Sequence, residues 1–217
     1  TGTYNVSIYD VNSCYFTDSF IVSEPPMLTN SFSISNVTCN GSSDANISSI
    51  PAGGVQPYSY YWSNNDTTQS ISNLSAGTYS YSIIDSQNCI YLGDILITEP
   101  IAVSVSPIIS NVSCFSGNDG FSILNISGGV SPYSESWGIY DPAALFSGNY
   151  LFTVIDSNGC NYVDSITITQ PDQIIVSSST QDALCSGANN GSASLQIIGG
   201  IPPYNQDWGI NNPNALS

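Results

Sequence analysis

The chain has 217 residues and contains no Lys, Arg or His, against 16 Asp and Glu, so its formal charge is −16. Nucleic-acid binding needs cations that displace counterions from phosphate, and an anionic membrane surface would repel this chain. Apolar residues make up 41% of the sequence, enough for a folded core, and no apolar run reaches the roughly 18 residues of a membrane span. We therefore exclude nucleic-acid binding and membrane insertion, and the mostly uncharged polar surface favours an extracellular protein.

One sequence pattern occurs three times along the chain. The tryptophans Trp62, Trp137 and Trp208 are 75 and 71 residues apart, and the same two offsets relate Cys14 to Cys89 and Cys160, and Cys39 to Cys114 and Cys185. The four-residue difference lies between the Trp and the next Gly-x-Tyr, which indicates a loop that tolerates insertion. The sequence also begins and ends in phase with its repeat, which predicts a piece of a longer array.

Within one repeat, short segments rich in β-branched and aromatic residues alternate with Gly, Pro, Asn and Asp, and no segment has helical periodicity. In chain order we expect strands at 28–39, 45–50 and 58–63, a crossing segment at 67–74, and strands at 78–85 and 89–100. The predicted fold is all-β, with tandem immunoglobulin-like sandwiches of about 71–75 residues. The predicted boundaries are 1–25 (last two strands of a preceding repeat), 26–100 and 101–171 (complete repeats), and 172–217 (first strands of a following repeat).

The aromatic residues support an immunoglobulin-like sandwich. The pattern Leu-x-x-Gly-x-Tyr at Tyr79 and Tyr150 matches the tyrosine corner, in which a Tyr at the start of the sixth strand bonds to the backbone just upstream. Tyr4 occupies the equivalent position in the first copy. We expect Trp62, Trp137 and Trp208 in the cores of their repeats, and a platform for sugar binding is the alternative.

The six cysteines predict disulfides, because the chain looks secreted and has neither His nor a Cys-x-x-Cys pair for zinc. Three pairings keep the repeat symmetry: Cys39 with Cys89, with Cys14 or with Cys160. In an immunoglobulin-like repeat Cys39 and Cys89 lie at opposite ends, about 33 Å apart, whereas a disulfide needs Cα atoms within roughly 7 Å. We prefer the inter-repeat pair Cys39–Cys160, and Cys39–Cys89 remains the alternative if the strand order differs. In the preferred scheme, partners outside this sequence are needed by Cys14, Cys89, Cys114 and Cys185.

The acidic residues lie where turns favour them. Asp85 and Asp156 open a turn four residues before a cysteine, and Asp44 and Asp119 lie in the turn after the first strand of each repeat. Calcium ligation by these four is the alternative, because a strongly acidic extracellular chain attracts hard cations. Without His or Lys, we expect no enzyme and no obligatory cofactor.

The middle copy, "VSCFSGNDGFSILNISGGVSPYSESW" followed by "GNYLFTVIDSNGC" and "ITITQP", resembles the SprB repeat of gliding-motility adhesins of Bacteroidota, with immunoglobulin-like or PKD-like domains. The resemblance implies export by the type IX pathway, a cell-surface filament, and a role in adhesion or gliding. It implies neighbouring repeats, other filaments, glycans or surfaces as partners. It also implies O-glycosylation at Asp-Ser/Thr motifs, for which Thr67 and Ser165 are candidates.

Overall fold

In the computed structural model, which describes residues 1–209 and 211–216, every regular element is a β-strand. This confirms the predicted all-β class. No helix among the described residues is long and apolar enough to cross a membrane. The chain divides into two compact units, Thr1–Ile101 and Ala102–Ser217.

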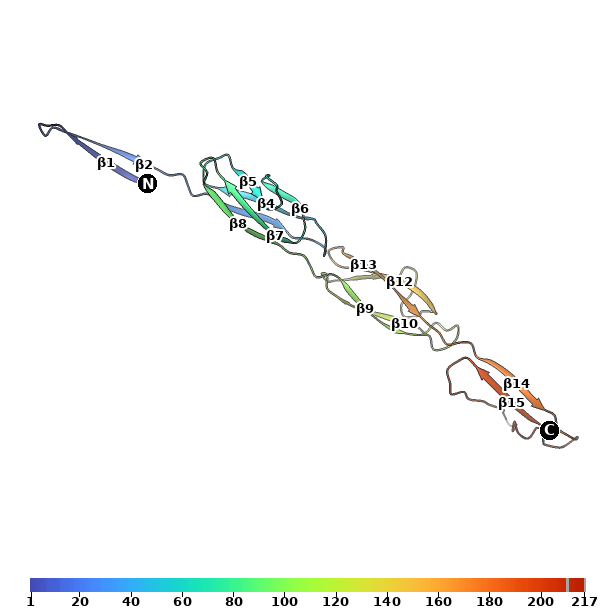
Figure 1. The fold of residues 1–217 in the computed structure, drawn as a ribbon. Helices are drawn as coiled ribbons and strands as arrows, with labels where there is room; N and C mark the ends of the chain where they lie inside the picture. The colour runs from blue at the N-terminus through green and yellow to red at the C-terminus, as the bar shows by residue number, and fades with distance from the viewer. Residues whose placement is uncertain (210, 217) are drawn as a thin grey trace. The chain divides into compact units, whose positions relative to one another are not determined.

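The first unit contains a hairpin and a two-sheet sandwich. Its strands are β1 (Gly2–Tyr9), β2 (Tyr15–Val22), β3 (Thr29–Ser35), β4 (Ala45–Ala52), β5 (Ser59–Trp62), β6 (Ser70–Leu74), β7 (Gly77–Ile84) and β8 (Ile90–Ile97). Strands β1 and β2 pair with each other, and the sandwich consists of the antiparallel sheets β3-β4-β6 and β5-β7-β8 (Figure 1). Strands β3, β4 and β6 thus correspond to strands A, B and E of an immunoglobulin-like domain, and β5, β7 and β8 correspond to strands C, F and G.

The core of this sandwich follows from the period-two alternation of its strands. On β4, Ala45, Ile47 and Ser49 point inward and are fully buried, whereas their neighbours are more exposed. Ile95 and Ile97 do the same on β8 and pack in the same cluster as Trp62.

Two of the expected segments of the first complete repeat differ from the structure. The first strand ends at Ser35, not at residue 39, because Asn36 and Val37 turn toward the end of β8. There the Thr98 N–H donates to Asn36 Oδ1 (3.0 Å) and the Val37 N–H donates to the Thr98 carbonyl (3.1 Å). The expected crossing segment 67–74 contains a true strand, β6, which pairs with β4.

The second unit repeats the design with a shorter middle. Its strands are β9 (Ser104–Ser110), β10 (Phe121–Ser127), β11 (Ser134–Ser136), β12 (Gly148–Ile155), β13 (Asn161–Ile168), β14 (Ile175–Gln181) and β15 (Ser192–Ile198). Strands β9 and β10 face the sheet β11-β12-β13, and β14 pairs with β15. In place of β6 there is a single bridge between Gly120 and Leu145, because the loop after Trp137 is four residues shorter.

Candidate functional site

The cysteines lie in two kinds of turn. Cys39, Cys114 and Cys185 follow the first strand of a repeat, and Cys14, Cys89 and Cys160 precede its last strand. Cys39 and Cys160 are bonded to each other in a disulfide. The cysteines that are free and exposed are Cys14, Cys89, Cys114 and Cys185.

The turn that holds Cys39 is fixed by hydrogen bonds to side chains. Asp44 Oδ1 accepts the Thr38 N–H (3.1 Å), and the Thr38 hydroxyl bonds to the other carboxylate oxygen. The Thr38 side-chain bond and then its backbone bond lower the pKa of Asp44 from the ordinary value. At the other side of the turn, Glu99 Oε2 accepts the Gly41 N–H (2.7 Å). The turn is therefore tied to the segment that follows β8.

The second complete repeat reproduces this turn with different side chains. Asp119 accepts the Ser113 N–H (3.0 Å) and hydroxyl (2.5 Å), and these two bonds lower the pKa of Asp119 in the same way. Gln170 takes the role of Glu99 and accepts the Ser116 N–H (2.9 Å). Asp44 and Asp119 thus act as hydrogen-bond acceptors within their own turns.

The turn that holds Cys89 is organised by the buried carboxylate of Asp85. Its Oδ1 accepts the N–H groups of Gln87 (2.9 Å) and Cys89 (2.8 Å), and its Oδ2 accepts the Val55 N–H (2.9 Å). Burial would raise the pKa of Asp85, but the backbone donors of Cys89, Val55 and Gln87 outweigh it, so the pKa is lowered. The carboxylate locks the turn onto the loop that precedes β5.

Asp156 makes the same contacts in the second complete repeat. Oδ1 accepts the N–H groups of Asn158 (2.9 Å) and Cys160 (2.9 Å), and Oδ2 accepts the Val130 N–H (2.8 Å). Here too burial acts to raise the pKa, and the backbone donors lower it below the ordinary value. The structure therefore anchors the bonded Cys160 in a turn with fixed geometry.

The two cysteine turns lie at opposite ends of a repeat. The Cys39 turn bonds to residues after β8, whereas the Cys89 turn lies before β8 and bonds to Val55. An eight-residue strand is about 25 Å long, far beyond the roughly 7 Å between Cα atoms that a disulfide allows. A Cys39–Cys89 bond would thus require the sandwich to open.

The four candidate calcium ligands are not brought together. Asp44 and Asp85 lie at opposite ends of the first complete repeat, as Asp119 and Asp156 do in the second. Within residues 1–209 and 211–216, no group of three or more His, Cys, Asp or Glu side chains is arranged to hold a metal ion.

The tyrosines near the starts of β7 and β12 bond back to the chain. The Tyr79 hydroxyl donates to the Ser75 carbonyl, and the Tyr150 hydroxyl to the Phe146 carbonyl, both at 3.1 Å. Tyr4, in the hairpin, instead stacks on Phe20 with ring centroids 5.8 Å apart.

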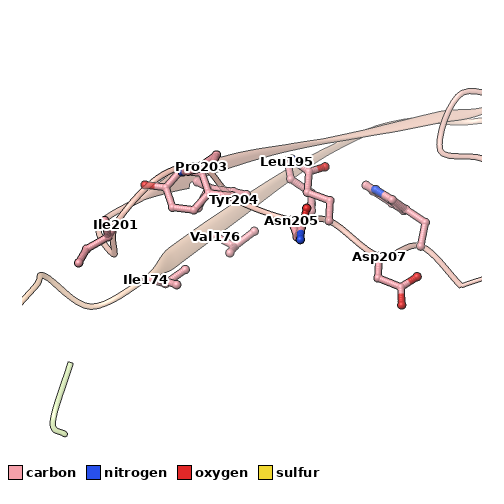
Figure 2. Close-up of a pocket in the computed structure, with 11 residues that line it drawn as sticks. Ile174, Val176, Leu195, Ile201, Pro203, Tyr204, Asn205 and Asp207 are labelled. Atoms are coloured by element: carbon pink, nitrogen blue, oxygen red, sulfur yellow. The ribbon is translucent and has the colours of Figure 1, made fainter. Parts of the chain in front are cut away.

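The three tryptophans differ in burial. Trp62 and Trp137 are only 5% and 6% exposed, which leaves little ring surface for a sugar to stack on. Trp208 is half-buried and lines an open apolar pocket on the inner face of β14 and β15, with Val176, Leu195 and Tyr204 (Figure 2).

A hydrogen bond within the loop before the third strand region occurs in all three copies, and it was not predicted from the sequence. The hydroxyl of the Tyr in each Pro-Tyr pair donates to the carbonyl of a Gly five residues earlier: Tyr58 to Gly53 (2.6 Å), Tyr133 to Gly128 (2.6 Å) and Tyr204 to Gly199 (2.5 Å). The preceding Pro is cis in each case. The signal in the sequence is the constant Gly-Gly-x-x-Pro-Tyr spacing of the three copies.

The two candidate glycosylation residues are exposed. Thr67 lies in the loop between β5 and β6, and Ser165 lies on β13. Each follows an Asp that accepts hydrogen bonds locally: Asp66 from the Thr68 N–H (2.9 Å) and Asp164 from the Ser165 N–H (2.7 Å).

The comparison with protein families identifies the repeat. The SprB repeat family matches residues 31–67 and 177–209. Both segments run from the first to the third strand region of a repeat, and the middle copy has the same strands in β9, β10 and β11. No curated protein matches the chain. The chain is thus similar to the SprB repeat over two segments, one in each of its two units.

Proposed function

We propose that this chain is part of a non-enzymatic cell-surface filament or adhesin, in which tandem β-sandwich repeats provide length for adhesion or gliding. The SprB match supports this role, because the sequence pattern implies a surface adhesin. The composition supports it too. With no His and no Lys, the chain lacks the usual general bases and amine nucleophiles. The buried carboxylates Asp85 and Asp156 are occupied by backbone N–H groups.

The observation that carries the proposal is the Cys39–Cys160 disulfide. Cys39 lies in the first turn of repeat 26–100, and Cys160 lies in the last turn of repeat 101–171. Such a bond links consecutive repeats and contributes about 2–4 kcal/mol to stability. Small sandwiches bury only about 60% of their unfolded surface, so they benefit from crosslinks. In this role, the disulfide turns a chain of separate sandwiches into a rod that resists tension.

Mass spectrometry of the non-reduced protein tests the pairing directly. Trypsin has no cleavage site in this chain, so the digest needs an Asp-specific or aromatic-specific protease. We expect a linked peptide pair containing Cys39 and Cys160 that separates on reduction. A linked pair containing Cys39 and Cys89 would overturn the inter-repeat staple.

Force spectroscopy on the single chain tests the mechanical role. While the disulfide is intact, the roughly 120 residues between Cys39 and Cys160 cannot extend; reduction should add about 400 Å of contour length at 3.3–3.6 Å per residue. Cys160→Ser should show the longer contour without reductant. The control Cys89→Ser changes a free cysteine and should behave as the parent chain. An extension that does not depend on reductant would contradict the proposal.

A further inference from the structure

We propose that two copies of this chain associate through the open edge of β10, strand against strand, and form one continuous sheet across a twofold axis. The edge belongs to the repeat at 101–171, and β9 to β13 all lie within that range. It is open because the loop after Trp137 is short, independently of any neighbouring repeat. The contact goes beyond the stapled filament, because it joins separate chains side by side.

In the first complete repeat, the corresponding edge is covered. Strand β4 pairs with β6 as far as Ser48. At the next position, the Ser49 N–H donates to the Gln69 carbonyl (3.1 Å), and the Gln69 side-chain amide donates to the Ser49 carbonyl (2.8 Å). The following edge position is Pro51, which has no N–H to donate. This edge of β4 is therefore protected against a further strand.

Strand β10 has only part of this cover. Its loop forms the bridge at Gly120, and the Ser122 N–H donates to the Pro142 carbonyl (2.9 Å). Alternate residues of a strand point their N–H and C=O groups to the same side, so Leu124 and Ile126 present theirs at this edge. Among residues 1–209 and 211–216, neither residue has a hydrogen-bond partner there. The upper half of the edge is thus open.

The two open residues differ in kind from their counterparts on β4. By the repeat offset, Leu124 is equivalent to Ser49 and Ile126 to Pro51. Ile126 therefore supplies the N–H that Pro51 lacks, and the short loop has no side chain in the place of Gln69. Each copy offers two donors and two acceptors along one strand, which is what β-strand addition requires.

Charge indicates that the partner is a second copy. The charged side chains of the chain are all acidic, but β9 and β10 contain none, so two copies can meet here without opposing carboxylates. The outer side chains beside the edge are also apolar. Ile108 is 51% and Ile123 is 56% exposed, whereas their counterparts in the first complete repeat are Ser33 and Ser48. The repeat with the open edge thus also has the less polar sheet face.

The open groups determine the register. If Leu124 of each copy lies opposite Ile126 of the other, every free N–H meets a free C=O in an antiparallel ladder. Ser122, whose N–H is already bonded, is not needed. Asn125 then lies at the twofold axis and faces the same residue of the second copy. Such an isologous contact uses the same patch twice, so assembly stops at the dimer.

The test uses the full chain with its free cysteines replaced by serine at positions 14, 89, 114 and 185, so intermolecular disulfides cannot form. Cys39 and Cys160 are kept, and the outcome is independent of the proposed staple. Sedimentation velocity at rising protein concentration should show a dimer, twice 22.9 kDa. The dimer should become stronger as salt screens the repulsion between two acidic chains. A monomer at every protein and salt concentration would overturn the proposal.

A proline at position 126 tests the strand pairing. Ile126→Pro removes the N–H that the second copy needs, and the fold tolerates proline at the equivalent position of β4, Pro51. The dissociation constant should rise by about thirtyfold, since each dimer loses two hydrogen bonds. The control Ile126→Ala removes the side chain but keeps the N–H, so it should dimerise nearly as the parent does. Association that is unchanged by the proline, or weakened equally by alanine, would contradict the pairing.

A charge placed at the axis tests the register. Asn125→Asp brings two carboxylates opposite each other, with Cβ atoms about 4.5–5.5 Å apart, and should prevent the dimer at low salt. The control Ser106→Asp adds the same charge on β9, directly beside Asn125. There the two carboxylates are about 14 Å apart, beyond the Debye length of about 8–10 Å, so the dimer should persist at 0.1 M salt and above. Equal effects of the two substitutions would reject the proposed register.

Discussion

The indole Nε1 of Trp62 donates a hydrogen bond to the carbonyl oxygen of Thr68 at 2.9 Å. In the second complete repeat, Trp137 occupies the equivalent core position, but its Nε1 is buried and has no partner within the described part of the chain. The difference follows from the loop, because the four residues that separate the two repeats in length lie after the tryptophan. The longer loop contains β6, which pairs with β4, and it supplies the Thr68 carbonyl that accepts the hydrogen bond of the Trp62 indole.

Replacing each tryptophan by phenylalanine should therefore have unequal effects. Trp62→Phe loses a hydrogen bond and leaves the Thr68 carbonyl without its donor, whereas Trp137→Phe removes a buried donor that already lacks a partner. We expect Trp62→Phe to lower the local opening free energy by about 1 kcal/mol more than Trp137→Phe. Hydrogen exchange of peptic peptides from β7 and β12 measures this locally. Equal losses would show that the Thr68 contact contributes nothing.

The Gly-Gly loop before β5 gives a second prediction. Gly53 has φ +71°, and a Cβ there would lie 2.1 Å from the Met27 carbonyl oxygen. Gly41 has a similar φ of +75°, but a Cβ there would meet no atom within 4 Å. Gly41→Ala should cost about 1 kcal/mol through backbone conformation alone. Gly53→Ala should destabilise by clearly more, because the backbone at Met27 must move. Denaturant unfolding of the two variants provides the comparison, and similar midpoints would contradict the clash.

The tyrosine hydroxyls give a third prediction. Tyr150 is 6% exposed, and Tyr150→Phe would leave the Phe146 carbonyl without its donor. We expect a loss of about 1 kcal/mol in unfolding free energy, measured by hydrogen exchange across β12 and β13. The control is Tyr61→Phe, because Tyr61 is 53% exposed on β5. If both variants exchange alike, the corner contact does not stabilise the repeat.

The sequence alone predicted the elements that depend on local pattern. Repeat offsets located the turns of Cys39 and Cys160, and alternating apolar residues located β7 and β8. It did not predict that β6 would pair with β4 while its counterpart makes a single bridge at Leu145. That pairing depends on how a variable loop packs over a sheet edge, which is a tertiary contact with no periodic signal.

The early end of the first strand was missed for a related reason. Residues 28–39 continue a β-like pattern, so propensity alone extends the strand to Cys39. In the structure, the Asn36 side chain and the Val37 N–H bond to Thr98, which is 62 residues away from Asn36 in the sequence. Long-range partners of this kind are visible only once the two sheets face each other.

The buried carboxylates predict how stability depends on pH. The pKa values of Asp85 and Asp156 in the folded chain lie below the ordinary value of 3.8, because backbone N–H groups bond to the ionised form and outweigh burial. A carboxyl whose pKa is lower in the folded state contributes stability that is fully present above the unfolded pKa. This stability is lost as the pH falls from the unfolded pKa through the folded pKa. We therefore expect unfolding midpoints to be steady above about pH 5 and to fall below about pH 4.

Acid unfolding usually also reflects repulsion among cationic side chains, but this chain has no Lys, Arg or His to supply it. Protonation of hydrogen-bonded carboxylates is thus the main destabilising effect of acid. Protonation also reduces the repulsion among the carboxylates, which stabilises the fold, and high salt screens this second effect. Asp85→Asn and Asp156→Asn together should make the loss of stability between pH 5 and pH 2.5 smaller at high salt, measured by denaturant titration, and Asp44 and Asp119 account for part of what remains. If the parent chain is equally stable at pH 7 and pH 2.5, the ionised carboxylates stabilise their turns no more than the protonated carboxyl groups do.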